Sequence, residues 1–195
     1  MGRLTRILSE NIPQLTTAEI EADIERAGYE RPRFYDRAAE HNGFPPFLHP
    51  FYIWLLEHGR IPTPEQHINL YFALYPWAGD SHRRGLEARI LRAWPSIVRD
   101  LHLTALLREA GMRVTYSVDF DRAGVDVAVW PPLDGRPPLY VHAYVWSPRA
   151  EHFRRRKVQG PRHFDLPLLR REARVVGNVW LYQAPIHTER VRAAL

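Results

Sequence analysis

An aspartate, a histidine and a tyrosine lie where two neighbouring strands could bring them together. Asp126 interrupts the valine-rich run Gly124-Val-Asp-Val-Ala-Val129, and His142 and Tyr144 alternate with apolar residues in Tyr140-Val-His-Ala-Tyr-Val-Trp146. A carboxylate beside an imidazole can hold a divalent ion, and the imidazole shifts the preference from Mg²⁺ toward Mn²⁺, zinc or nickel. Such an ion activates water for hydrolysis. Tyrosine is neutral at pH 7, so Tyr144 does not carry a positive charge that could stabilise an attacking hydroxide.

Structural roles for these residues remain open. Asp126 could lie in water at the start of a hairpin. If it is buried, it needs a partner or a metal, because an unpaired buried carboxylate is costly. Arg122 or His142 could be that partner without any catalysis. His142 could also be a core or surface histidine whose hydrogen bonds are satisfied.

The elements that must position these residues lie in the second half of the chain, where apolar residues repeat every second position. A loop rich in proline, 131–138, joins two of the expected strands as a hairpin. The expected elements are strands over 113–119, 125–130, 139–146 and 175–183 and helices over 149–158 and 166–174. The last strand follows a helical crossover, which predicts a mixed four-stranded sheet with helices on both sides. A short polar tail is expected after Pro185.

The first half of the chain is predicted to be helical. Thr16-Thr-Ala-Glu19 and Thr63-Pro-Glu-Gln66 are capping boxes that start helices. Pro95 is expected to break or kink the helical pattern. The expected helices follow Thr16 and cover 33–41, 47–58, 63–75, 81–94 and 96–110. The fold class is therefore α+β or α/β, with a helical region at 1–95 and an α/β core at 96–195.

The order of the elements resembles the PD-(D/E)XK nuclease superfamily, which has the restriction-endonuclease-like fold. The resemblance covers about residues 96–184. It rests on Leu106-Leu-Arg-Glu-Ala-Gly-Met-Arg-Val114 before the first strand, on Gly124-Val-Asp-Val127, and on the apolar third strand. It implies a core that binds one or two Mg²⁺ ions and hydrolyses phosphodiesters.

The match to the family motif is incomplete. Asp126 matches the metal-binding aspartate, and Asp100 is a loose match to an acid on the preceding helix. His142 falls where the family has a glutamate, and Tyr144 falls where it has a lysine. The resemblance therefore implies a degenerate site, with Mg²⁺ or Mn²⁺ as the ion if it is active and no cofactor otherwise.

Two residues outside the third strand could replace the missing groups, as some members of the family allow. These are Glu151 and Lys157, and Lys157 is the only lysine in the chain. The candidate catalytic residues are Asp126, His142, Tyr144 and Lys157, and the candidate metal ligands are Asp126, His142 and Asp100.

Positive charge is concentrated in the second half. Residues 99–195 carry 16 basic and 10 acidic side chains, whereas residues 1–98 carry 11 and 12. Such a surplus suits a phosphate backbone, although a solvated helix face is the alternative. The candidate nucleic-acid-binding residues are Arg149, Arg154, Arg155, Arg156, Lys157, Arg162, Arg170 and Arg171.

Composition excludes several classes of protein. With no cysteine, the chain has no disulfides and no cysteine-based metal site. No apolar run is long enough to span a membrane, and the first residues lack the features of a signal peptide. Hydrophobic residues make up 45% of the chain, enough for a core. A cytoplasmic protein is the expectation.

Three functions are compatible with these observations. The first is a nucleic-acid-binding protein, for DNA in particular, on a nuclease-like core with an inactive site. The second is an active metal-dependent DNA nuclease with a non-standard site at Asp126 and His142. The third is a subunit of a phage, mobile-element or defence complex that contacts a protein partner through the helical half, whose aromatic content suits a core or an interface.

Overall fold

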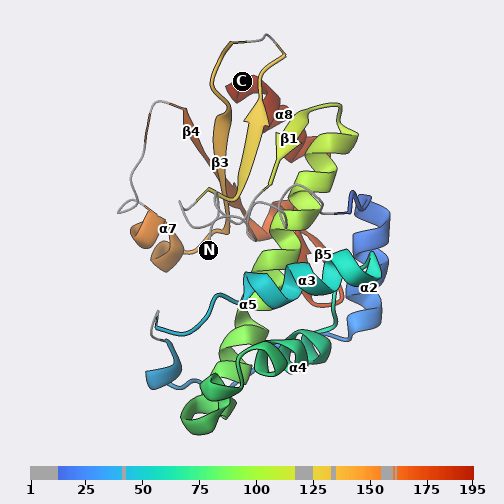
Figure 1. Cartoon of the computed structure of the whole chain (residues 1–195). Helices are drawn as coiled ribbons and strands as arrows, with labels where there is room; N and C mark the ends of the chain where they lie inside the picture. The colour runs from blue at the N-terminus through green and yellow to red at the C-terminus, as the bar shows by residue number, and fades with distance from the viewer. Residues whose placement is uncertain (1–12, 41–42, 117–124, 133–134, 155–159, 161) are drawn as a thin grey trace. The chain divides into compact units, whose positions relative to one another are not determined.

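The chain mixes helices and sheet, as its residue pattern predicts (Figure 1). The computed structural model describes residues 13–40, 43–116, 125–132, 135–154, 160 and 162–195. It divides into two compact units. We call the described part of 13–98 with 176–179 the helical unit, and that of 99–175 with 180–195 the sheet-bearing unit. None of the described helices is long and apolar enough to cross a membrane.

The helices of the helical unit begin where the capping residues predict. In each capping box the threonine side chain accepts a backbone N–H three residues on, and Glu19 or Gln66 bonds back to the threonine amide. The elements are α2 (Thr17–Ala27), η1 (Ala38–Glu40), α3 (Leu48–His58), α4 (Pro64–Leu74), η2 (Pro76–Ala78) and the first part of α5 (Gly79–Glu109).

Aromatic side chains dominate the core of this unit. Tyr29 stacks on Trp94 with ring centroids 5.4 Å apart, and the Trp94 indole donates to the Pro62 carbonyl at 2.9 Å. The Asp23 carboxylate accepts the Ile61 amide at 3.0 Å, which ties the end of one loop to α2. A second cluster contains Ala39, Tyr71, Phe72, Ala78, Leu86 and Ile90.

The predicted helix over 33–41 is wrong for the described residues, because only Ala38–Glu40 form a 3₁₀ turn. Carbonyl groups of this segment accept hydrogen bonds from side chains of α5 and not from backbone N–H groups of a helix. Arg92 donates to the Phe34 carbonyl at 2.5 Å, and Arg89 donates to the Ala39 carbonyl at 2.9 Å. These contacts span 50 and 58 residues of sequence, so a local pattern does not reveal them.

Helix α5 is longer than predicted. It runs from Gly79 to Glu109 through Pro95, and its one non-helical backbone conformation is at His82 rather than at the proline. Proline removes one backbone N–H from the helical ladder, but the backbone at Pro95 keeps helical angles. The predicted stop at Gly111 is close to the observed end.

The four-stranded mixed sheet is present in the sheet-bearing unit, in the order β1-β2-β3-β4. Strands β1 to β3 pair antiparallel, and β3 pairs with β4 in parallel. Residues 117–119 of the first predicted strand lie outside the described residues. The strands are β1 (Arg113–Thr115), β2 (Val127–Trp130), β3 (Leu139–Val145) and β4 (His163–Leu168).

The fourth strand is not the one that the sequence predicted. Residues 163–168 form β4, whereas 166–174 was expected to be a helix. Helix α7 (Pro148–Arg154) crosses over between β3 and β4, and residues 155–158 of its predicted span lie outside the described residues. Three further residues, Arg170–Glu172, form only a 3₁₀ turn, η3. Pairing with β3 decides the conformation of 163–168, because six residues of each strand are in register.

The predicted strand over 175–183 is instead a hairpin. Strands β5 (Arg174–Val176) and β6 (Val179–Leu181) form a separate two-stranded sheet around a turn at Gly177 and Asn178, both of which have positive φ. The expected polar tail is also wrong, since Ile186–Ala194 form the helix α8.

Candidate functional site

Asp126 is bound to the backbone of the neighbouring strand. It directly precedes β2, and its Oδ2 accepts the Ala143 N–H at 2.6 Å. The Asp126 amide donates to the Val141 carbonyl at 3.1 Å. A short bond from an amide to a carboxylate is charge-assisted and therefore strong. The residue that best matches the family motif thus holds the edge of the β2–β3 ladder.

His142 forms a pair with another histidine. His142 is buried, with 2% of its surface exposed, and its Nε2 lies 2.7 Å from Nδ1 of His163 on β4. One of these nitrogens must donate and the other accept, so the pair shares a single proton at this contact.

Asp165 and Arg154 lie beside this pair. Asp165 is in register with His142 across the parallel β3–β4 ladder, so the two side chains emerge on the same face. Arg154 at the end of α7 is almost completely buried, and its Nε contacts Asp165 Oδ1 at 2.8 Å. We call His142, His163, Asp165 and Arg154 the polar face. Tyr144 lies two residues along β3 on the same side, opposite Pro167.

The predicted metal ligands do not form a ligand set. Among the described residues, no three histidine, aspartate or glutamate side chains are placed to hold a metal ion. Asp100 is buried on α5, Asp126 bonds to an amide, and His142 bonds to His163. Mg²⁺ and Mn²⁺ need several oxygen ligands around one point, and these side chains do not supply them.

The predicted basic residues fall into three groups. Arg155, Arg156 and the catalytic candidate Lys157 lie outside the described residues. Arg154 is engaged by Asp165, and Arg162 is partly buried and donates to the Pro137 carbonyl at 3.1 Å. Arg149, Arg170 and Arg171 are exposed, as a surface that contacts phosphates requires.

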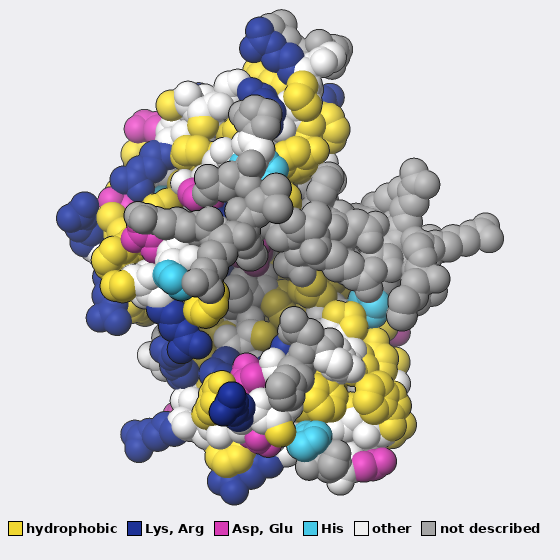
Figure 2. Space-filling model, turned by 90° about the vertical axis from the view of Figure 1, so that its left-hand side faces the viewer, with side chains coloured by type: hydrophobic (Ala, Val, Ile, Leu, Met, Phe, Trp, Pro, Cys, Tyr) yellow, Lys and Arg dark blue, Asp and Glu magenta, His cyan; other side chains and the backbone are white. Residues whose placement is uncertain are grey.

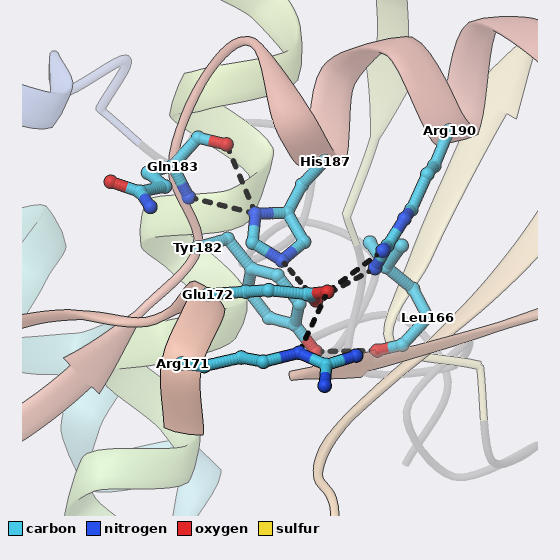
Figure 3. A network of polar contacts seen from close by, with 7 residues as sticks. All are labelled: Leu166, Arg171, Glu172, Tyr182, Gln183, His187 and Arg190. Carbon is cyan, nitrogen blue, oxygen red and sulfur yellow. Dashed lines mark hydrogen bonds and ion pairs between the residues drawn. The ribbon is translucent and has the colours of Figure 1, made fainter. Parts of the chain in front are cut away.

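A second polar network ties α8 to η3 (Figure 3). Arg190 donates two hydrogen bonds to the Glu172 carboxylate, at 2.8 and 2.9 Å. These bonds hold the pKa of Glu172 below its usual range. The fully buried His187 lies beside Glu172, with its Nε2 3.9 Å from Glu172 Oε2. Burial lowers the pKa of His187, so the ring is neutral at pH 7.

This network is structural. Nδ1 of His187 lies 3.0 Å from the Gln183 nitrogen and 3.0 Å from the Gln183 carbonyl oxygen, so it accepts from the one or donates to the other according to its tautomer. The Tyr182 hydroxyl donates to the Leu166 carbonyl of β4 at 2.7 Å (Figure 3). Burial raises the pKa of Tyr182. The network fixes α8 beside the sheet, with His187 and Tyr182 buried in it and Arg190 at the surface.

His163 and Asp165 were not among the predicted site residues. His163 lies 21 residues from its partner, and the expected helix over 166–174 concealed the strand that carries both residues. The alternation of His163-Phe-Asp-Leu-Pro-Leu168 is the signal that could have identified it.

Comparison with known proteins adds no relative: no protein-family model, no curated protein and no solved structure matches the chain.

Proposed function

We propose that the chain binds DNA through the sheet-bearing unit and does not hydrolyse it at Asp126 and His142. The observation that carries the proposal is a set of exposed arginines on a unit with surplus positive charge. Arginine forks bind phosphate oxygens bidentately, and the counterions released on binding add to affinity. The exposed set is Arg113, Arg136, Arg149, Arg170, Arg171 and Arg174.

Carboxylates cancel this charge only in part, although Glu172 Oε1 lies 4.0 Å from Nε of Arg171 in the exposed set. Residues 99–195 hold 16 basic and 10 acidic side chains, and Asp126, Asp165 and Glu172 are already bonded within the unit. Figure 2 shows arginines in dark blue at many points of the face in view, with scattered carboxylates between them. The absence of hydrolysis is supported by the bonds that Asp126 and His142 make to protein atoms.

Binding is tested by fluorescence anisotropy with a labelled DNA duplex at fixed salt. The variant Arg171→Ala/Arg174→Ala is expected to bind several-fold more weakly than the wild type, because it loses two phosphate contacts. The control Arg60→Ala/Arg83→Ala removes the same charge from exposed positions of the helical unit. Equal loss in both variants, or a wild type that does not bind, would overturn the proposal.

Active hydrolysis is the second candidate, favoured by the placement of His142, His163 and Asp165 on one face of the sheet. Plasmid and single-stranded DNA are incubated with excess protein and Mg²⁺ or Mn²⁺. We expect no product. Cleavage that disappears in Asp126→Ala would show that this face is an active site and that the proposed inactivity is wrong.

A further inference from the structure

Three arginines surround two adjacent aromatic residues in the segment Arg31-Pro-Arg-Phe-Tyr-Asp-Arg37 of the helical unit. Arg31, Arg33 and Arg37 are exposed, and their side chains make no hydrogen bond or ion pair within the described chain. Between them, Tyr35 is 62% exposed and Phe34 is 37% exposed. Tyr35 therefore offers a flat ring to solvent beside three positively charged side chains.

Helix α5 fixes the two rings from one side. The Arg84 guanidinium lies 4.2 Å from the centre of the Phe34 ring, and that of Arg92 lies 5.4 Å from the centre of the Tyr35 ring. Arg92 also donates to the Phe34 carbonyl at 2.5 Å. Each ring is therefore held against a cation, and the exposed part of the Tyr35 ring remains open to a further planar group.

The carboxylates of Asp36 and of the nearby Glu40 make hydrogen bonds within the helical unit. Asp36 Oδ1 accepts the Ala38 N–H at 2.9 Å. Glu40 accepts a hydrogen bond from Arg92 and lies 3.8 Å from Arg89. Asp36 keeps its negative charge in its bond to the Ala38 amide, so residues 31–37 carry three positive charges and one negative charge, and the segment is net positive.

We propose that residues 31–37 bind single-stranded DNA, with a base stacked on Tyr35 and phosphates on the flanking arginines. We call these residues the arginine–aromatic segment. Single strands are bound by basic surfaces that carry aromatic platforms, because unpaired bases expose their flat faces. Three exposed arginines within seven residues give the segment the positive charge that suits a polyanion. The choice of DNA rests on the proposed function, but the site lies on the other unit.

The test separates stacking from charge. Anisotropy is measured with an oligo(dT) of about 12 nucleotides and with an abasic strand of the same length, which keeps the phosphates and lacks the bases. Tyr35→Ala is expected to weaken oligo(dT) binding about tenfold and to leave abasic binding unchanged. The control Trp77→Ala removes another exposed aromatic ring of the helical unit and is expected to change neither.

Charge is tested with Arg31→Ala/Arg33→Ala/Arg37→Ala, which is expected to weaken binding of both strands. Circular dichroism confirms that each variant is folded. The inference is overturned if Tyr35→Ala binds oligo(dT) as tightly as the wild type, or if it loses as much affinity for the abasic strand as for oligo(dT). It is also overturned if the arginine–aromatic segment binds a protein and the wild type does not bind single-stranded DNA.

Failure of this inference differs from failure of the proposed function. If the duplex still binds through Arg171 and Arg174 while Tyr35→Ala has no effect, only the role of the arginine–aromatic segment is wrong. If the wild type binds neither duplex nor single strand, both proposals are wrong.

Discussion

The hydrogen bond from the Ala143 amide determines what Asp126 can do. A carboxylate that accepts a backbone N–H at 2.6 Å stabilises the β2–β3 edge whether or not it has any chemical role. The same holds for His142, whose Nε2 is engaged by His163 at 2.7 Å. Two residues that resemble a metal site by position thus make hydrogen bonds to neighbouring strands.

Substitution of Asp126 distinguishes the structural from the catalytic role. Asp126→Asn keeps an oxygen that accepts the Ala143 amide, so we expect a loss of less than about 1 kcal/mol in the free energy of unfolding. Asp126→Ala leaves that amide without its acceptor and is expected to cost about 1–3 kcal/mol. Urea denaturation of both variants measures the difference. Equal losses would contradict the structural role.

His67 is expected to make stability depend on pH. Burial lowers the pKa of His67 to about 4, below the ordinary value of 6.5, while Nε2 lies 2.7 Å from the Phe47 carbonyl. Between these values the unfolded chain binds a proton that the folded chain does not. Stability is therefore lost as pH falls from about 6.5 to 4, by up to about 3 kcal/mol.

The variant His67→Gln checks this expectation, because the glutamine amide nitrogen takes the place of Nε2 and can still donate to the Phe47 carbonyl but does not titrate. Chemical denaturation from pH 4 to pH 7 is expected to give a flatter stability profile for the variant than for the wild type. Parallel profiles would show that His67 does not titrate on unfolding as proposed. Burial also lowers the pKa of His187, and its contribution to the pH dependence of stability is the same in both proteins.

At the element scale, Gly85 allows the arginine–aromatic segment to lie against α5. A Cβ added at Gly85 would lie 2.5 Å from Asp36 Oδ2 and 2.7 Å from the Ala39 Cβ. Alanine usually stabilises a helix relative to glycine by about 1 kcal/mol. At position 85 the close contacts with Asp36 and Ala39 outweigh this gain, so alanine is expected to destabilise the protein.

We predict that Gly85→Ala lowers the free energy of unfolding by about 1–3 kcal/mol. The control is Ser96→Ala, at an exposed position of the same helix, which is expected to have little effect. Thermal and urea denaturation measure both variants. A more stable Gly85→Ala protein would mean that the segment does not approach α5 this closely.

The helix α8 depends on its bond to η3. Removing Arg190 leaves the carboxylate of Glu172, which is 12% exposed, without its bidentate partner. We expect Arg190→Ala to cost about 1 kcal/mol and to increase hydrogen exchange in α8 before the rest of the chain. Glu189→Ala, on the exposed side of α8, is the control. Unchanged exchange in α8 would contradict the role of the network.

For the whole molecule, charge rather than shape governs the proposed binding. The chain has a net charge of +5 and a sequence pI near 9.8. The logarithm of duplex affinity is expected to fall linearly with that of salt concentration, and Arg171→Ala/Arg174→Ala is expected to reduce the slope by about 2. The control Arg60→Ala/Arg83→Ala is expected to keep the wild-type slope. A salt-independent affinity would rule out phosphate contacts as the source of binding.

Local signals determined much of the secondary structure from the sequence alone. The capping boxes at Thr16 and Thr63 fixed two helix starts, and the period-2 patterns of β2 and β3 identified adjacent strands. These signals work because each depends on residues within one turn or one strand. The mixed sheet with a helical crossover followed from their order.

Only the tertiary structure decided what the candidate site residues do and which segment forms the fourth strand. Residues 163–168 become a strand because β3 offers them hydrogen bonds, and 175–183 fold back as a hairpin around Gly177 and Asn178. Asp126 and His142 find partners 17 and 21 residues away. The sequence by itself determined which residues could bind a metal ion or phosphate. Their actual hydrogen-bond partners come from distant segments, and contacts of that kind form only when the chain is folded.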